Sequence, residues 1–543
     1  MNLVVLIVGP IVGGLLAWLF GKVGKAWTRI WPLLFLLLDL VLLLVIWFSG
    51  NPNALTLGGS GFYAETLLPW IPAFGIQVHL ALDGLSLALS LLTVFLGILV
   101  ILASWRRQRE HPPFYYFNLS LVLAGILGTF LAVDLFLFFL FWELMLVPTY
   151  FLITAWGGDG TLEGDRRRAA AGFKFFVFTQ LSGLLMLVSI LALYFLHGAA
   201  TGSYTFDLFE LIGTPLSSGA SFAIMLGFLA AFAVKLPVVP FHSWLPDAYT
   251  EAPLEATIIL AGLMSKTGAY GFLRFVFPLF QNAASQIRLV MLILGVIGIV
   301  YGAVLAFGQR DLKRLVAYTS VSHLGFVLVG IFSMNQIAME GAVLLMISHG
   351  LATSGLFLVV DLIERRTGTR DLRRLGGLFS VVPKLGGAGM VFGLIALGVP
   401  GSGNFLSEVL VIIGTFRVSI PIAIIAATGM IFSVIYALWI IQRALHGPQP
   451  GESVAEGSHG AAGVHDAGGS LSGAAGGHGG AGHGAAGVPA RAAQILAGMH
   501  DLSFIEGAVS IIMILAVFWL GIYPQPLLQL VAALLQHIHG GIA

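Results

Sequence analysis

Cysteine is absent from this chain of 543 residues. Iron–sulfur clusters need cysteine ligands and covalent haem attachment needs a Cys-x-x-Cys-His motif, so neither group is expected here. A P-loop signature and a dinucleotide-binding fingerprint are also missing, since no strand or nucleotide-binding unit surrounds the short Gly401-Ser402-Gly403. We therefore expect no cofactor and no metal site in this chain. Any electron transfer coupled to it must take place in another chain.

Charged residues are scarce: they make up 9% of the chain, whereas hydrophobic residues make up 58%. A soluble globular domain carries about 25% charged residues. The net charge of +1 is too small to indicate nucleic-acid binding. Apolar runs of about 20 residues recur from end to end, and each is long enough to cross a bilayer. Because backbone groups in lipid must pair within their own segment, the composition predicts an all-α polytopic membrane protein.

These runs predict about fourteen transmembrane helices, at residues 3–20, 30–48, 82–104, 114–133, 135–155, 171–196, 221–240, 254–279, 287–307, 315–333, 339–362, 384–416, 420–442 and 504–522. The first is expected to be a retained span, because no basic residue precedes it and no convincing cleavage site is present. We divide the chain into N-terminal spans (1–113), two five-span units (114–280 and 281–445), a loop (446–500), and a last span with a C-terminal tail (501–543).

Two of the predicted spans are interrupted by proline and glycine. The seventh contains Lys235-Leu-Pro237-Val-Val-Pro240, and the twelfth contains Leu397-Gly-Val-Pro400-Gly-Ser-Gly403. Each proline removes a backbone donor and clashes with the carbonyl four residues earlier. Broken helices at corresponding places in two halves are typical of transporters with inverted repeats. We therefore predict that spans 4–8 and 9–13 are two inverted five-helix repeats. Two unrelated proline kinks are the alternative.

The basic residues indicate an orientation. Of the 26 Lys and Arg residues, 20 lie in odd-numbered connections or at their edges. Because basic loops stay on the cytoplasmic side, this asymmetry predicts cytoplasmic odd-numbered loops in a bacterial inner membrane. With an even number of spans, both termini then lie outside.

The loop between the last two spans has a different composition, dominated by Gly, Ala and His. It lacks the apolar residues that offset the entropy of ordering, so a disordered cytoplasmic linker is predicted. A metal-binding loop is the alternative, since the Gly/Ala-rich stretch from residue 447 to about residue 490 contains four histidines, at positions 459, 465, 478 and 483. Their spacing matches no fixed ligand geometry, which favours the linker.

Six ionisable side chains are predicted to lie within spans, where a charge costs about 2.5–3.5 kcal/mol by insertion scales. They are Glu143, Lys235, Lys266, His323, His349 and Glu408. Burial lowers the pKa of a lysine and raises that of a carboxylic acid, while histidine already titrates near neutrality. The set therefore suits protons that move through the plane of the membrane.

Each of the six has a structural alternative. The acids could be an ion-pair partner and a helix cap, the lysines could bind carbonyls freed at helix breaks, and the histidines could be hydrogen-bonded core residues. Six costly groups spread over six spans favour a proton path over six independent structural roles. In contrast, Asp39 and Asp83 are expected to be structural.

Three motifs resemble the antiporter-like subunits of respiratory complex I (NADH-quinone oxidoreductase). They are Trp142-Glu143-Leu-Met-Leu-Val-Pro148, the run from Lys235 to Asp247, and Ser265-Lys266-Thr-Gly-Ala-Tyr270. The resemblance covers residues 80–445 and resumes from His500 to Pro524. It implies an H⁺-translocating subunit with one proton channel and no redox chemistry of its own. Flavin, iron–sulfur clusters and quinone are expected in other subunits of the complex.

The resemblance also implies roles and neighbours. Glu143 would modulate Lys235, Glu408 would exchange protons with the positive side, and the connecting groups would be Lys266, His323 and His349. Glu408 favours the M-type branch of the family, because the L- and N-type branches have lysine there. Those two types are the expected membrane-arm neighbours.

Two alternatives stay open: a D-type subunit of a multisubunit Na⁺/H⁺ antiporter, and a non-pumping structural membrane subunit. The D-type subunits typically carry lysine at the position of Glu408. The chain also departs from the family pattern at Tyr249, where histidine is usual. Because a tyrosine has a pKa near 10, we expect it to take up and release protons less readily than the usual histidine.

The orientation can be tested with epitope tags. A tag at residue 470 should be accessible only from the cytoplasm, whereas tags at the two termini should be accessible from the periplasm of intact cells. Labelling of the residue-470 tag from the periplasm would show that the predicted topology is wrong.

Overall fold

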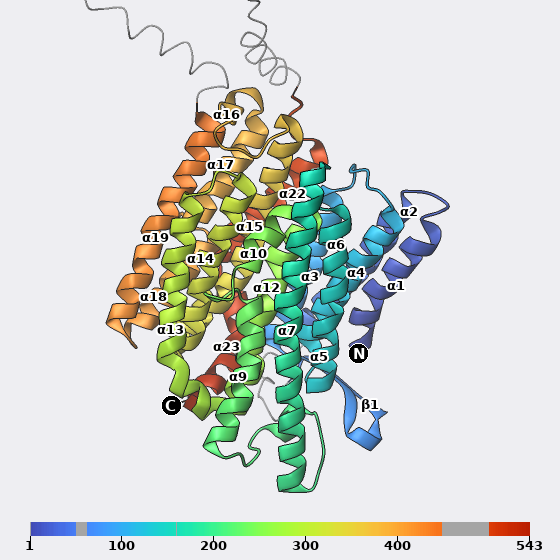
Figure 1. Cartoon of the computed structure of the whole chain (residues 1–543), viewed down its shortest axis with the longest axis vertical. Helices are drawn as coiled ribbons and strands as arrows, with labels where there is room; N and C mark the ends of the chain where they lie inside the picture. The colour runs from blue at the N-terminus through green and yellow to red at the C-terminus, as the bar shows by residue number, and fades with distance from the viewer. Residues whose placement is uncertain (1, 50–61, 159, 448–498, 543) are drawn as a thin grey trace, which may run out of the picture.

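The computed structural model describes residues 2–49, 62–158, 160–447 and 499–542. Most helices run roughly along the long axis of the molecule (Figure 1). The first half comprises α1 (Val4–Phe20), α2 (Trp27–Ser49), β1 (Ala64–Ile71), the 3-10 turn η2 (Pro72–Phe74), β2 (Ile76–Leu82), α3 (Gly84–Ala103), α4 (Pro112–Leu131), α5 (Leu135–Leu144), α6 (Leu146–Trp156), α7 (Leu162–Thr201), α8 (Leu208–Leu211), α9 (Ser218–Lys235), α10 (Trp244–Glu251), α11 (Leu254–Ile259), the π-helical turn η3 (Leu260–Met264) and α12 (Ser265–Gly271).

The second half begins with a further π-helical turn. It comprises η4 (Phe272–Val276), α13 (Phe277–Phe307), α14 (Leu312–Phe332), α15 (Gln336–Thr367), α16 (Leu378–Val381), α17 (Pro383–Leu397), α18 (Gly403–Phe416), α19 (Ile420–Ile440), the π-helical turn η5 (Ile441–His446), α22 (Phe504–Ile522) and α23 (Gln525–Ile542).

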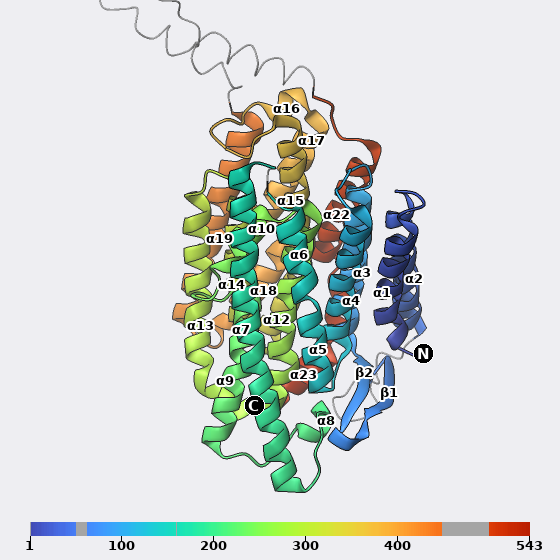
Figure 2. The ribbon, with the colours of Figure 1, turned by 45° about the vertical axis from the view of Figure 1, so that its right-hand side comes forward.

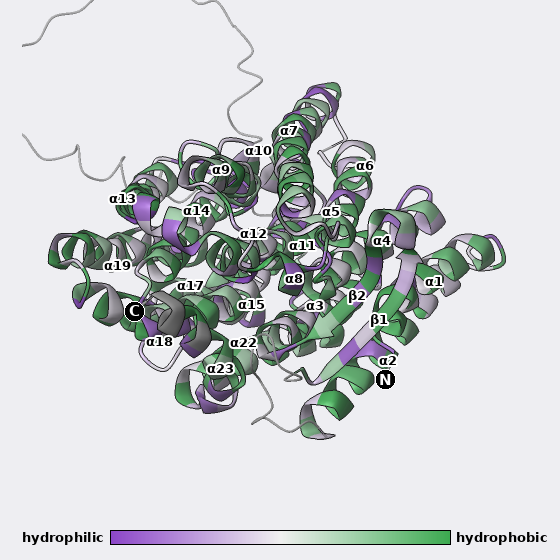
Figure 3. Ribbon diagram, turned by 90° about the horizontal axis from the view of Figure 1, so that it is seen from below, coloured by the Kyte–Doolittle hydropathy of each residue, from purple (hydrophilic) through white to green (hydrophobic). Residues whose placement is uncertain are grey.

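Within the described residues, 11 helical runs are long and apolar enough to cross a membrane. The outward faces of the bundle are largely hydrophobic (Figure 3), whereas every residue in the most apolar stretch of α15 is buried inside the molecule. The prediction of an all-α polytopic membrane protein is therefore confirmed. Each predicted span overlaps a helix, while the number of crossings and the unit boundaries stay predictions. The predicted linker falls almost wholly on residues 448–498, outside the described residues.

Three features differ from the predicted spans. Strands β1 and β2 form an antiparallel hairpin, α23 follows the last predicted span, and α7 has 40 residues instead of 26. Strands of eight and seven residues, an amphipathic helix and a polar helix extension do not produce a 20-residue apolar run. A search for such runs therefore misses them.

Both predicted helix breaks are confirmed. Helix α9 ends at Lys235, and helical structure resumes at Trp244 of α10. Helix α17 ends at Leu397, followed by Gly398 with a φ of 82°. Helix α18 then starts at Gly403, where the Ser402 side chain accepts a hydrogen bond from the Phe405 amide. The breaks place helix ends, with their unpaired backbone groups, inside the bundle.

The basic loops gather at one end of the bundle, which we call the basic end. Arg29 donates to the Arg107 carbonyl, Arg314 pairs with Asp247, and Arg366 donates to the His500 carbonyl. The hairpin and α8 lie at the opposite end, which we call the hairpin end (Figure 2). This gathering agrees with the prediction from the sequence that the basic, odd-numbered connections lie on the same side of the membrane.

Two short backbone clamps have the same hydrogen-bond pattern. In the hairpin-end clamp (residues 132–135 and 205–208), the Leu135 amide donates to the Phe206 carbonyl at 2.8 Å, and the Leu208 amide donates to the Val133 carbonyl at 2.9 Å. In the basic-end clamp (residues 310–312 and 370–372), the Leu312 amide donates to the Arg370 carbonyl and the Leu372 amide donates to the Arg310 carbonyl, both at 2.9 Å. All four leucines follow an aspartate: Asp134, Asp207, Asp311 and Asp371.

Candidate functional site

Four of the predicted residues form a buried polar row in the second half of the chain. The Lys266 ammonium lies 3.0 Å from His349 Nδ1, and His323 Nδ1 lies 2.8 Å from a Glu408 carboxylate oxygen. The rings of His323 and His349 are 5.5 Å apart between centroids. All four residues are at most 3% exposed. The structure thus brings together one lysine–histidine pair, from α12 and α15, and one histidine–glutamate pair, from α14 and α18.

Tyr436 of α19 extends this row, although no prediction named it. Its hydroxyl lies 3.0 Å from His323 Nε2, so both ring nitrogens of His323 have partners. The available signal was weak: a single tyrosine, three residues after Ser433, in an otherwise apolar span. Because tyrosine fits an apolar core as well as a polar site, only the contact identifies it.

Glycines allow the helices of the row to approach closely. A Cβ atom on Gly350 of α15 would lie 2.9 Å from the Gly262 carbonyl of η3. On the other side, a Cβ atom on Gly403 of α18 would lie 2.8 Å from the Ser348 Cβ atom. These contacts hold α15 against both partners, and they place His349 between Lys266 and the break that precedes Glu408.

Lys266 is held by the π-helical turn that precedes it. Its ammonium donates to the Ala261 carbonyl and, at 3.2 Å, to Ser265 Oγ. A π-helical turn loosens the regular hydrogen-bond ladder of a helix and often lies at a functional site. Tyr249 binds the same turn, because its hydroxyl donates to the Leu260 carbonyl at 3.0 Å. The tyrosine that replaces the usual histidine is therefore buried and engaged with backbone.

Glu143 and Lys235 form a second, separate group. The Lys235 ammonium lies 5.1 Å from the centre of the Trp142 ring, beside Glu143, and the two charges are close enough to interact electrostatically. No hydrogen bond joins them, and among the described residues neither the Lys235 ammonium nor Glu143 Oε1 has a hydrogen-bond partner. Glu143 lies against Gly183 of α7, where a Cβ atom would come within 2.2 Å of Oε1.

The structure does not join this group to the row by a described hydrogen bond. The helices that carry Lys235 and Lys266 are nevertheless packed together, since a Cβ atom on Gly268 would lie 2.6 Å from the Phe232 carbonyl. The six predicted residues therefore lie on adjoining helices as two bonded pairs and one electrostatic pair.

The two aspartates expected to be structural differ. Asp83 caps α3 by accepting from the Ser86 amide at 2.9 Å, and it forms a buried ion pair with Arg274 at 2.5 Å. Asp39 lies between α1 and α2 against Gly9, and its oxygens have no hydrogen-bond partner within the described residues. Contacts thus support a structural role for Asp83 alone.

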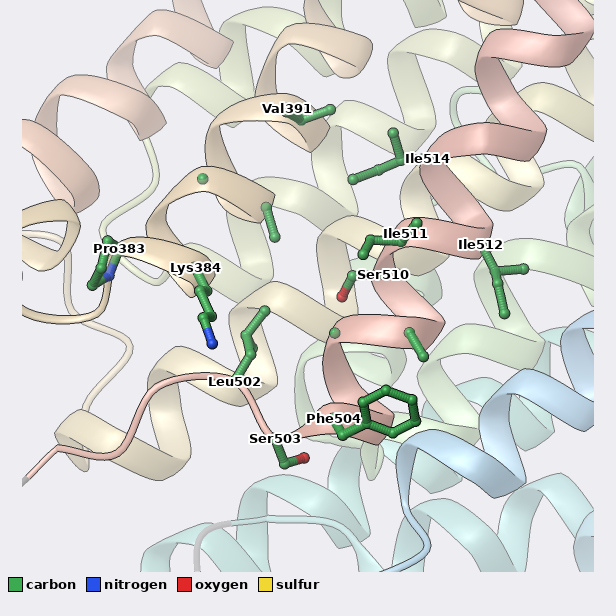
Figure 4. Close-up of a pocket in the computed structure, with 14 residues that line it drawn as sticks. Pro383, Lys384, Val391, Leu502, Ser503, Phe504, Ser510, Ile511, Ile512 and Ile514 are labelled. Atoms are coloured by element: carbon green, nitrogen blue, oxygen red, sulfur yellow. The ribbon is translucent and has the colours of Figure 1, made fainter.

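The polar row lies apart from a surface groove between α17 and α22. A groove of 780 Å³ lies between α17 and α22, with Lys384 and Ser503 near one another and apolar side chains such as Val391 and Ile514 further along (Figure 4). None of the six predicted residues lines it. The four members of the row are instead buried within the bundle.

Comparisons with known proteins agree with these features. A family model described as NADH:quinone oxidoreductase/Mrp antiporter, TM, matches residues 132–435. The chain is 47% identical over 443 residues to NADH-quinone oxidoreductase subunit M of Escherichia coli (strain K12), which covers 81% of this chain and 87% of that protein. Identity to subunit M of Pseudomonas aeruginosa is also 47%, over 445 residues, with 82% and 87% covered.

Solved structures show the same arrangement of helices. A chain of respiratory complex I from Thermus thermophilus with bound NADH matches with a TM-score of 0.81 at 27% identity, and 100% of both chains is covered. A chain of the Mrp complex from Dietzia sp. DQ12-45-1b matches with a TM-score of 0.75 at 21% identity, covering 99% of this chain and 52% of that one. The second match shows a likeness of fold alone.

The close contact at Gly350 can be tested by adding one methyl group. Gly350→Ala should destabilise the protein by about 1–3 kcal/mol, because the Cβ atom forces α15 away from η3. Gly387→Ala on α17 is the matched control, since its Cβ atom meets nothing within 4 Å. The midpoint of thermal unfolding in detergent should fall for the first variant and not for the second. Equal midpoints would show that the contact is not tight.

Proposed function

Because this chain belongs to the family of NADH-quinone oxidoreductase subunit M, the antiporter-like membrane subunits of complex I, we propose that it carries protons across the membrane. Quinone reduction in other subunits would drive this movement. The observation that carries the proposal is the buried row from Lys266 through His349 and His323 to Glu408. Each member can bind or release a proton. Lys266–His349 and His323–Glu408 lie within hydrogen-bond distance, and the centres of the two histidine rings are 5.5 Å apart.

The contacts define how a proton could pass along the row. A Lys266 ammonium can donate to His349 Nδ1, after which the imidazolium can release a proton from Nε2. His349 Nε2 and Glu408 Oε2 are buried atoms without a partner among the described residues. Buried polar atoms of this kind are usually satisfied by ordered water. A water molecule between them would complete the connection from His349 to Glu408.

The ring of His323 can act as a switch beside Glu408. With Tyr436 donating to Nε2, the neutral ring carries its proton on Nδ1 and donates to the carboxylate. In the other tautomer, Nε2 donates to Tyr436 and Nδ1 accepts from a protonated Glu408. The two tautomers stabilise opposite protonation states of the acid, so a tautomer change can accompany uptake or release at Glu408.

The separate pair would set the state of the row by electrostatics. A negative Glu143 favours a charged Lys235, whereas loss of that charge favours release of the lysine proton. Lys235 at the end of α9 adjoins the helix of Lys266, so its charge acts on the first member of the row. Conformational or electrostatic input from the rest of the complex would enter at this pair.

The two clamps support the proposed inverted repeats. Asp134 precedes the second helix of the first repeat and Asp311 precedes the second helix of the second repeat. Their partners, Asp207 and Asp371, follow the third helix of each repeat. The same Asp-Leu pairing at opposite ends of the bundle is expected if one unit is turned over relative to the other.

The remaining assignments follow from this function. The chain would lie in a bacterial inner membrane with the basic end in the cytoplasm and both termini outside. Its partners would be the other membrane-arm subunits, with L-type and N-type neighbours. We propose no cofactor in this chain and assign flavin, iron–sulfur clusters and quinone to other subunits. An Na⁺/H⁺ antiporter subunit is disfavoured, because the subunit M relatives are 47% identical to this chain, whereas the chain of the Mrp complex is 21% identical.

The role of Glu143 can be tested with an isosteric amide. Glu143→Gln keeps the shape but removes the charge, so pumping should fall by about tenfold or more while the complex still assembles. Glu163→Gln is the control, since that side chain is 84% exposed at the start of α7. Proton uptake by membrane vesicles, normalised to assembled complex, measures the effect. A normal proton-to-electron ratio in the assembled Glu143 variant would leave only a structural role.

Glu408 offers a test that separates a titrating group from a helix cap. Glu408→Gln should lose most pumping, whereas Glu408→Lys should retain more, because lysine can also exchange a proton. A structural cap predicts the reverse order, since lysine brings the opposite charge and greater length. The measurement is vesicle proton uptake per assembled complex on a native gel. If both variants pump like the parent, Glu408 is not on the proton path.

A further inference from the structure

The N-terminus of α5 is held between two other segments at the hairpin end. On one side, strand β2 contacts the turn before α5: the Val133 amide donates to the His79 carbonyl at 3.1 Å, and the Gln77 amide donates to Asp134 Oδ2 at 3.1 Å. On the other side lies the segment 205–208 of the hairpin-end clamp. Because Asp134 caps α5 through the Leu137 amide, this mixed backbone pairing determines where α5 begins.

The side chain of His79 closes this arrangement across both flanking segments. Its Nδ1 atom forms a short hydrogen bond to Asp207, and its Nε2 atom lies 2.8 Å from Glu65 Oε1 of β1. His79 and Asp207 are buried, and Asp134 is fully buried beside them. Among the described residues, the ion pairs of Glu65 and Asp207 are with His79 alone.

Two carboxyl groups face His79: Glu65 from β1 and Asp207 from the start of α8, while the Phe209 ring lies 5.8 Å away. Asp134, at the start of α5, is the third carboxyl group of the cluster, and it interacts electrostatically with Asp207. When His79 is neutral, these carboxylates have no compensating charge within the cluster, and their repulsion opposes the pairing of the segments.

The basic-end clamp uses the same backbone pairing with a different cation. Asp311 is paired with Arg370 at 3.0 Å, and Asp371 is paired with Arg373 at 2.6 Å. Hydrogen bonds from Arg373 lower the pKa of Asp371 to about 2, and arginine stays charged at all physiological pH values. This clamp is thus insensitive to pH, whereas the hairpin-end clamp depends on a group that titrates.

The hairpin-end clamp is coupled to Glu143 through one short helix. Asp134 caps the N-terminus of α5, and Glu143 lies near its C-terminus, about 13 Å away at 1.5 Å per residue. The Glu143 carboxyl group packs against Gly183 with no free space for a methyl group. A small displacement of α5 therefore changes the position of Glu143 relative to α7 and Lys235.

We propose that His79 is a positioning residue whose proton keeps the hairpin-end clamp closed, so that the pH on the hairpin side controls the placement of α5 and Glu143. With His79 protonated, the clamp holds α5 in the described position. Loss of this proton loosens the contact between the hairpin, α5 and α8. The part of the inference that concerns pumping rests on the proposed role of Glu143.

The direction of the pH effect follows from the titrating groups. Burial opposes the charge on His79, but hydrogen bonds and attraction to Asp207 and Glu65 outweigh it and raise the pKa of His79. The stabilisation is therefore present below the ordinary histidine value of about 6.5 and is lost as pH rises through the raised pKa. Burial raises the pKa of Asp134 from 3.8 to about 6, so ionisation of this acid weakens the clamp below about pH 6, and the change above that pH belongs to His79.

Hydrogen exchange of the intact complex measures the clamp directly. Exchange in peptides that cover residues 130–136 and 204–210 is divided by the exchange of the same unfolded peptides, which removes the intrinsic effect of pH. Between about pH 6 and about pH 9, this ratio should rise about tenfold or more in the parent, since each pKa unit corresponds to tenfold in the equilibrium. Peptides of the basic-end clamp are the internal control and should show a constant ratio.

Three variants separate a titrating clamp from a purely structural one. His79→Arg supplies a permanent charge and should give a low, constant ratio, whereas His79→Gln should give a high ratio already at low pH. His197→Gln is the matched control, because His197 is also a buried histidine but contacts the neutral Thr214 at 2.8 Å. It should keep the pH dependence of the parent. A flat ratio in the parent, or the same profile in parent and His79→Arg, overturns the proposal.

Reconstituted complex tests the coupling to Glu143. The pH on the hairpin side is raised while the other side is held constant, and protons moved per electron are measured. The number of protons moved per electron should fall in the parent and stay constant in His79→Arg. If hydrogen exchange of the clamp peptides responds to pH but the number of protons moved per electron does not, the clamp exists and its coupling to Glu143 is overturned. If no variant or parent pumps, the proposed function fails while the exchange result for the clamp still stands.

Discussion

The cost of placing charge in the low-dielectric interior of a membrane protein is the constraint on which the rest of this structure depends. An ionised side chain is tolerated there only when a partner, a backbone carbonyl or a second charge compensates it. Lys266 meets this condition through a π-helical turn and His349, and Glu408 meets it through His323.

Close packing and helix breaks supply the compensation. The broken helices expose backbone groups inside the bundle, and glycines at the contacts let neighbouring helices approach until side chains meet. Gly350 and Gly403 place α15 between two partners, and Gly183 makes room for Glu143. The same close packing buries every member of the polar row.

The two clamps show how one backbone device can have different chemistry. Both join Asp-Leu sequences through a pair of amide–carbonyl hydrogen bonds, and both position the start of a helix that carries a residue of the proposed path. Arginines pair with both aspartates at the basic end, whereas at the hairpin end a histidine contacts one of the two, Asp207. If the two units derive from one inverted repeat, their ends face different compartments, and a titratable clamp is found at only one of these ends.

The sequence by itself determined the class of fold, the positions of nearly all helices, the two breaks and the six candidate residues. Apolar runs, prolines and isolated charges are local signals, and each has a direct physical cost in a membrane. Only the tertiary structure decided which candidates touch. It joined Lys266 to His349 and His323 to Glu408, left Glu143 and Lys235 as a separate pair, and added Tyr436 and His79. Contacts between residues more than 80 positions apart depend on helix packing, which no local pattern specifies.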